Sequence, residues 1–221
     1  MNLAASLFSS TWHLVMLLSS LAVCYRILKK AAWRQLLDGP RLSVTLGFGV
    51  CMMLLWSISA GVKPGLNLHL SGAMAAMLLL EPAFAILALG ISLTGIMLNG
   101  AIEWQSWPIN FIMMCVLPVL VASGIHRLAQ RWLPAHFFVF IFFTSFVGAG
   151  LTVMVQGAAA ALALALSGAY PAEFLLSDYL PYFLLLGFSE AWLSGAVVTL
   201  LVVYQPEWVM AFDDRRYLLN K

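Results

Sequence analysis

Two ionisable side chains in apolar surroundings are the best candidates for chemistry in this sequence. His69 opens the run HLSGAMAAMLLL, and Glu190 interrupts the run LLLGFSEAWLSGAVVTLL. Imidazole is the commonest metal ligand among side chains, and an acid in an apolar helix must be paired or protonated. Each has a structural alternative, in which His69 hydrogen-bonds a neighbouring carbonyl and Glu190 is a buried acid held by Ser or Asn of another helix.

Weaker candidates lie in other apolar segments. Asn110 and Gln156 are better explained by hydrogen bonds between helices, and His13 lies near the same side of the membrane as His69. The runs CMM at 51–53 and MMC at 113–115 contain soft-metal ligands, but adjacent residues on a helix point about 100° apart. Such a triplet cannot face one ion together, so packing is the favoured role of these residues.

Several catalytic motifs are absent from the sequence. It has no GxxxxGK[ST] loop, and therefore no ATP site of that kind, and it has no HExxH or GxSxG motif. We therefore expect a protein that is not an enzyme.

The composition places all of these residues in a membrane. Hydrophobic residues make up 63% of the chain and charged residues 9%, whereas soluble domains carry about 25% charged residues. Runs of about 20 apolar residues recur along the whole length, and a helix of that length crosses a bilayer. The sequence predicts an all-α polytopic membrane bundle that forms one integral membrane domain, residues 1–221, in contact with the lipid bilayer.

About seven segments are predicted to cross the membrane: 10–28, 43–62, 68–80, 83–101, 108–127, 136–167 and 179–204. The third is short, because Pro64-Gly65 breaks the chain before it and Glu81-Pro82 breaks it after. About 13 residues span about 20 Å, less than the ~30 Å hydrocarbon core. Short helices are tolerated where they are buried in protein or line a cavity.

This short helix is where we expect His69 to lie. Gly72, Ala73 and Ala76 follow His69 at helical spacing and form a face of small residues beneath the imidazole. Such faces allow helices to approach closely. The sequence therefore predicts His69 at the outer end of a tightly packed helix.

The basic residues predict the orientation of the chain. Ten of the eleven Lys and Arg residues fall between segments one and two, between segments five and six, or in the C-terminal tail, and only Lys63 does not. Seven crossings put all ten on one side, whereas dividing the long segment 136–167 would move the tail to the other. By the positive-inside rule, the N-terminus is outside and the C-terminus is cytoplasmic.

Three stretches resemble one known family. They are HLSGAMAAMLLLEPAFAIL, PINFIMMCVLPV and FSEAWLSGAVVTLLVVYQPEW. They are similar to the substrate-capture permease of cobalt and nickel energy-coupling factor transporters, the CbiM/NikM type, whose motif reads like GHLLGGALAAILLGPW. The resemblance covers about residues 61 to 208.

The resemblance implies a location and partners. It implies a protein of the bacterial plasma membrane that captures an ion at the outer face. Release of the ion then needs a membrane coupling subunit and cytoplasmic ATPase subunits. No covalent cofactor and no nucleic-acid partner are expected.

The resemblance also implies a set of metal ligands. The motif histidine corresponds to His69, and the other donors of the family are the terminal amine, the next backbone nitrogen and a histidine at position two. Here these positions are Met1 and Asn2, so the second imidazole is missing. Three donors remain, unless His13 or the Asn2 side-chain oxygen replaces the fourth. We expect the Met1 amine about 4–5 Å from the His69 imidazole, across a shared metal with ~2 Å bonds.

The leading hypothesis is a permease subunit that takes up a divalent transition-metal ion, nickel or cobalt by resemblance. The alternative is a permease or accessory membrane protein on the same scaffold for a non-metal solute. In that case Glu190 and Asn110 would contact the polar substrate.

Overall fold

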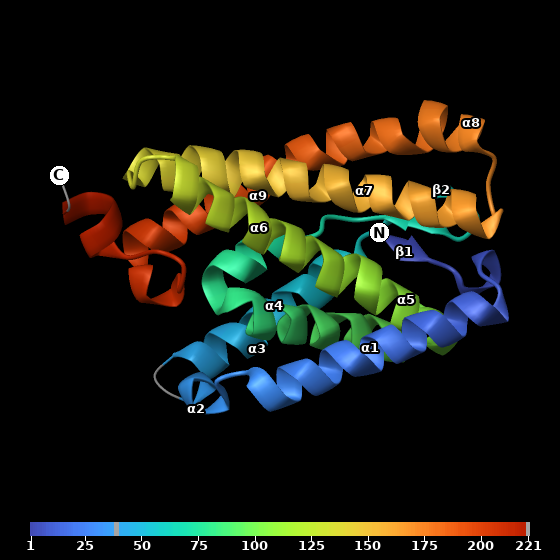
Figure 1. The fold of residues 1–221 in the computed structure, drawn as a ribbon, viewed down its shortest axis with the longest axis horizontal. Coiled ribbons are helices and arrows are strands. Elements are labelled where there is room, and N and C mark those ends of the chain that lie inside the picture. Colours follow the sequence, from blue (N-terminus) through green and yellow to red (C-terminus); the bar gives the residue numbers. More distant parts are fainter. Residues whose placement is uncertain (38–39, 220–221) are drawn as a thin grey trace.

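Long apolar helices form the body of the structure, a computed structural model that describes residues 1–37 and 40–219 (Figure 1). Within these residues, five helical spans are long and apolar enough to cross a membrane: Ser10–Lys30, Ala73–Leu98, Trp104–Trp132, Val139–Ser167 and Ala172–Tyr204. A shorter apolar helix covers Arg41–Ser57. The predicted all-α, polytopic membrane bundle is confirmed.

The elements of Figure 1 divide these spans as follows. The helices are α1 (Ser10–Lys30), α2 (Trp33–Leu36), α3 (Arg41–Ser57), α4 (Ala73–Leu98), α5 (Trp107–Asn110), α6 (Leu117–Trp132), α7 (Gly148–Ser167), α8 (Ala172–Phe174) and α9 (Leu180–Tyr204). Wider π-helical turns lead into α6 at Phe111–Val116, into α7 at Val139–Val147 and into α9 at Leu175–Tyr179. A further π-helical turn, Arg215–Leu219, lies in the C-terminal tail.

Helix α4 is broken in its first third. Glu81 has a φ of 63° and a ψ of 161°, which are not helical values, and Pro82 follows it. Proline has no N–H to donate, so it cannot continue the hydrogen bonds of the preceding turn. Residues 73–80 and 82–98 are therefore two halves, which correspond to the predicted third and fourth segments.

The carbonyl groups left free at this break are bonded by the C-terminal tail. The backbone N–H of Met210 donates to the Leu79 carbonyl at 3.3 Å, and that of Ala211 donates to the Leu78 carbonyl at 3.0 Å. The tail thus caps the first half of α4 at the end far from His69.

The prediction for the start of this helix was wrong. The helix begins at Ala73, not at residue 68, and His69 lies in an extended segment before it. The cause is a small antiparallel sheet of β1 (Asn2–Leu3), β3 (Leu66–Leu68) and β2 (Ala60–Lys63), in that order. Gly65 and Gly72 have positive φ and turn the chain on either side of β3. The predicted second segment, 43–62, ends early for the same reason.

The bundle has two different ends. The N-terminus and the sheet lie toward one end, and the C-terminal tail lies at the other, together with α2 and the connection between α6 and α7 (Figure 1). Helices α7 and α9 run side by side along one edge, and α1 runs along the opposite edge.

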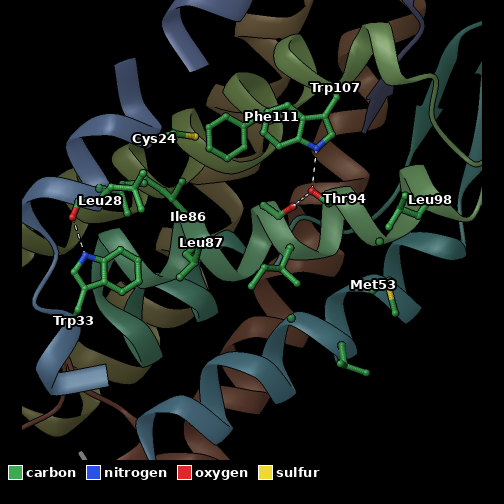
Figure 2. A pocket seen from close by; sticks show the side chains of 16 residues that line it. Cys24, Leu28, Trp33, Met53, Ile86, Leu87, Thr94, Leu98, Trp107 and Phe111 are labelled. Carbon is green, nitrogen blue, oxygen red and sulfur yellow. Dashed lines mark hydrogen bonds between the residues drawn. The ribbon is translucent and has the colours of Figure 1, made fainter. Parts of the chain in front are cut away.

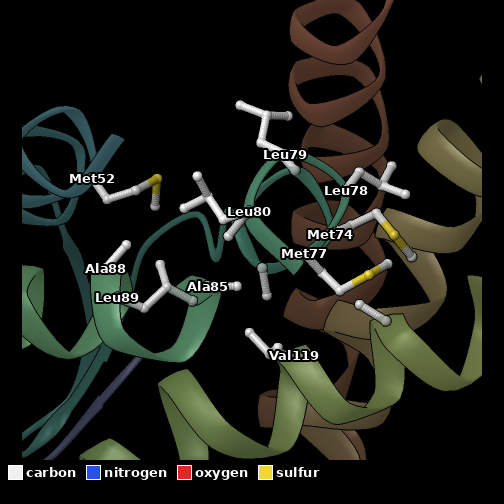
Figure 3. Close-up of a cluster of buried hydrophobic side chains, with 14 of the residues drawn as sticks. Met52, Met74, Met77, Leu78, Leu79, Leu80, Ala85, Ala88, Leu89 and Val119 are labelled. Carbon is white, nitrogen blue, oxygen red and sulfur yellow. The ribbon is translucent and has the colours of Figure 1, made fainter. Parts of the chain in front are cut away.

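The main core surrounds the break in α4. Figure 3 shows Met74 and Leu78 of the first half, Leu89 of the second half, Met52 of α3 and Val119 of α6 gathered in one cluster. In the most apolar 18-residue stretch of α4, 72% of the residues are buried, whereas in that of α1 only 6% are. Helix α4 is therefore embedded in protein, whereas α1 is exposed over most of its surface.

An apolar groove of about 550 Å³ lies between α1, α3 and the second half of α4 (Figure 2). Its few polar groups are paired within the protein, because the Trp33 indole N–H donates to the Leu28 carbonyl at 2.9 Å and the Trp107 indole N–H donates to the Thr94 hydroxyl at 3.1 Å. Apart from Cys24 and Met53, whose sulfur atoms lie on different helices, the walls are hydrocarbon.

Close packing of α7 on α9 generates a first prediction. A Cβ added at Gly157 would overlap the ring of Phe183. Gly157→Ala should therefore lower the unfolding free energy by about 1–3 kcal/mol, the usual range for overpacking. The measurement is thermal unfolding of the purified protein in detergent.

The matched control is Gly124→Ala on α6, where an added Cβ meets nothing within 4 Å. Because alanine is the better helix former, this variant should be neutral or more stable by about 0.5–1 kcal/mol. Equal unfolding temperatures for both variants would contradict the packing argument.

Candidate functional site

His69 is buried in the segment between β3 and α4, with 5% of its surface exposed. Its Nδ1–H donates to the Leu70 carbonyl at 2.8 Å, because a carbonyl can only accept. The lone pair of the neutral ring is therefore on Nε2. The indole of Trp56 lies against the imidazole, with ring centroids 5.1 Å apart, and fixes its orientation.

The chain's first two residues meet this lone pair. The Met1 amine is in direct hydrogen-bond contact with His69 Nε2, and the Asn2 Oδ1 atom lies 2.8 Å from the same nitrogen. Met1 and Asn2 are 2% and 7% exposed. The structure thus brings Met1, Asn2 and His69 together, with the amine closer to the imidazole than the separation expected across a metal.

Asn110 holds the N-terminal strand in this position. Its Oδ1 accepts from the Leu3 N–H at 2.9 Å, and its Nδ2 donates to the Leu3 carbonyl at 2.9 Å and to the Ser106 carbonyl at 3.0 Å. Pairing of Asn2 with Asn67 and of Leu3 with Leu66 completes the register. The amide of Asn110 therefore binds backbone groups of Leu3 and Ser106, whereas the sequence favoured hydrogen bonds between helices.

His13 is not part of this cluster. Its Nε2–H donates to the Ala5 carbonyl at 3.1 Å, and the Ala5 N–H donates to Glu103 Oε2 at 3.0 Å. The ring of His13 thus contacts the N-terminal segment, residues 1–8, rather than the cluster at His69. Glu103 was missed by the sequence analysis, since nothing in its local sequence indicates a backbone partner almost a hundred residues away.

Glu190 lies beside the segment that carries His69. It is 1% exposed and accepts from the backbone N–H groups of Ser71 at 2.8 Å and Gly72 at 2.7 Å, and from the Ser194 hydroxyl at 2.9 Å. The two backbone groups open α4 and have no partner within the helix. As its structural alternative, the sequence predicted that Ser or Asn of another helix would bond Glu190. The serine that does so, Ser194, instead lies one turn further along the same helix, α9.

Burial disfavours the charged forms of the two nitrogen donors. It lowers the pKa of the Met1 amine well below the ordinary value of 8.0, while the charges of Glu190 and Cys115 act in the opposite direction. Burial also lowers the pKa of His69 well below 6.5, and the charge of the Met1 amine adds to this, while the hydrogen bond to Leu70 opposes it. The imidazole therefore offers a free electron pair at neutral pH, and burial favours the neutral form of the amine.

The donor set differs from common metal sites. Among residues 1–37 and 40–219, no group of three or more His, Cys, Asp or Glu side chains could hold a metal ion. The cluster at His69 consists instead of an amine, an imidazole and an amide oxygen. In the CMM run, Cys51 is exposed and Met52 is buried, so these two side chains do not face one ion.

Comparisons with known proteins agree on one family and one fold. The family model of CbiM, cobalt uptake substrate-specific transmembrane region, matches residues 2–208. A crystal structure described as a transition metal transporter has a TM-score of 0.81 and 18% sequence identity, with 100% of each chain covered. A truncated transition metal transporter has a TM-score of 0.80 and 18% identity, covering 92% of this chain and 99% of its own. No curated protein sequence matches this chain.

The buried bases predict how stability depends on pH. In the unfolded chain, the amine becomes protonated below about pH 8 and the imidazole below about pH 6.5. In the folded protein, burial opposes the protonation of both groups. The unfolding free energy of the metal-free protein should therefore fall as the pH falls. Between pH 6.5 and 5.5, wild type should lose up to about 1.4 kcal/mol more than His69→Gln. Identical slopes in thermal unfolding at these two pH values would contradict this.

The anchoring by Asn110 predicts how accessible the N-terminus is. Asn110→Ala removes three hydrogen bonds and should release the N-terminal segment from the site. An amine-reactive reagent at pH 7.5 should then label Met1 at least tenfold faster than in wild type, by mass spectrometry. The control is Gln105→Ala, an exposed position on the same connection. Unchanged labelling of Asn110→Ala would show that the sheet alone holds the segment.

Proposed function

This chain belongs to the CbiM family of cobalt uptake substrate-specific transmembrane regions, and from that premise we propose that it captures a divalent transition-metal ion, nickel or cobalt, for uptake. The observation that carries the proposal is the convergence of the Met1 amine and Asn2 Oδ1 on Nε2 of His69.

The contacts around Nε2 favour a cation. With its proton on Nδ1, the imidazole presents a lone pair to Asn2 Oδ1, which is also an acceptor, at 2.8 Å. Two acceptors at that distance repel one another unless a cation lies between them or the amide is turned. Nitrogen and oxygen donors suit first-row divalent ions such as Co²⁺ and Ni²⁺. The backbone nitrogen of Asn2 is a fourth candidate donor by resemblance to the family.

The polar groups of the alternative hypothesis are already engaged. Asn110 is bonded to the Leu3 backbone, and Glu190 is bonded to the backbone of Ser71 and Gly72. Neither has its main hydrogen-bonding capacity free for a polar solute. We therefore favour the metal ion as substrate.

The arrangement of charge supports an orientation for uptake. The basic stretch after α1, the end of α6 and the C-terminal tail lie at one end of the bundle, opposite the sheet (Figure 1). We propose that this end is cytoplasmic and that the ion site opens outward, in a bacterial plasma membrane. The sequence has no ATP-binding loop, so a membrane coupling subunit and cytoplasmic ATPases would supply the energy as separate chains.

The site would release its ion by separating two segments. Met1 and Asn2 lie on the N-terminal segment, and His69 follows β3. Loss of the pairing between β1 and β3 would move the donor atoms of Met1 and Asn2 away from His69 in one step. Such a step changes the affinity without any change in the ligands themselves.

Variants of the donor residues test this function. His69→Ala should abolish binding of Ni²⁺ and Co²⁺ in calorimetry at pH 7.5, with the native N-terminus intact, because it removes the central donor. Asn2→His should strengthen Ni²⁺ binding at least tenfold by adding an imidazole.

The control for these measurements is His136→Ala, whose ring contacts Phe138 far from the site. It should bind both ions as wild type does. A folded His69→Ala protein with wild-type affinity would refute the proposed site.

A further inference from the structure

Glu190 is the one acidic side chain that is buried among residues 1–37 and 40–219, and no Lys or Arg in that part of the chain is buried with it. A buried carboxylate without a cationic side chain as partner is costly. The donor set proposed for the ion leaves this residue out. Its presence beside the site therefore needs an explanation of its own.

The hydrogen bonds of Glu190 fit its ionised form. Oε2 accepts from the Ser71 N–H, and Oε1 accepts from the Gly72 N–H and the Ser194 hydroxyl. Backbone N–H groups can only donate, so both oxygens act as acceptors. Charge-assisted bonds of this kind stabilise a carboxylate in a buried position.

The position of this charge relates it to the ion site. Ser71 and Gly72 follow His69 by two and three residues, so the carboxylate is tied to the segment that carries the imidazole. Amine, imidazole and amide oxygen are all neutral donors. A divalent ion bound by them would bring two positive charges into a buried site with no charge from its ligands.

We propose that Glu190 is the counter-charge of the ion site: a positioning residue that touches no ion, fixes the segment carrying His69, and selects divalent over monovalent cations. This rests on the proposed function. The Coulomb energy between a fixed charge and an ion is proportional to the ion's charge. Removing the carboxylate charge should therefore cost a divalent ion twice as much binding free energy as a monovalent ion.

The test compares Co²⁺ with Ag⁺ in wild type and Glu190→Gln, by calorimetry on the full chain in detergent. We expect Glu190→Gln to weaken Co²⁺ binding about a hundredfold and Ag⁺ binding about tenfold. The visible absorption spectrum of bound Co²⁺ should keep its band positions, because its ligands are unchanged. Equal losses for the two ions, or no loss, would overturn the counter-charge.

Ser194→Ala is the matched control, because it removes one hydrogen bond and keeps the carboxylate in place. It should leave the ratio of Co²⁺ to Ag⁺ affinities as in wild type, even if both affinities fall. Glu190→Asp keeps the charge but withdraws it from the site, so it should lower this ratio in the same direction as Glu190→Gln. If Glu190→Gln does not fold, these two variants decide, because a changed ratio in Ser194→Ala or an unchanged ratio in Glu190→Asp would overturn the proposal. Failure of wild type to bind either ion would instead refute the proposed function itself.

Discussion

Every backbone N–H and C=O group inside a membrane protein must find a partner, because lipid offers none. This constraint explains why Asn110 and Glu190 are buried although they are polar. The irregular segments at residues 1–8 and 69–72 would be prohibitively costly on their own. Asn110 satisfies both backbone groups of Leu3, and Glu190 satisfies two successive N–H groups before α4. Regular helices need no such help, so Asn110 and Glu190 reach from their helices to backbone that lies outside any helix.

The same constraint builds the candidate site. A donor cluster needs atoms that point inward from non-helical backbone, and here two such segments lie side by side as β1 and β3. Helices α3, α5 and α9 then supply one side chain each: Trp56 against the imidazole, Asn110 on the strand and Glu190 on the turn. The site is therefore a product of the whole bundle, although its donors come from only three residues.

The sequence predicts the spans well and the irregular segments poorly. Apolar length indicates the helices, and Pro82 indicates the break in α4, since both signals are local. The sheet was not predicted, because two residues of β1 carry no alternation and its partner lies more than sixty residues away. Asn110 and Glu190 were recognised as unusual from their surroundings. Their backbone partners could not be predicted, because those groups become free only in the folded arrangement.

The C-terminal tail has a consequence for how distant parts of the protein move together. Residues 73–80 form a rod about 12 Å long, at 1.5 Å per residue. Backbone bonds from Met210 and Ala211 hold one end of this rod, and the carboxylate of Glu190 holds the other, next to His69. Pro82 leaves the rod without a continuous helical connection to the rest of α4. The tail and the segment that carries His69 are therefore connected through one short helix, with hydrogen bonds at both of its ends.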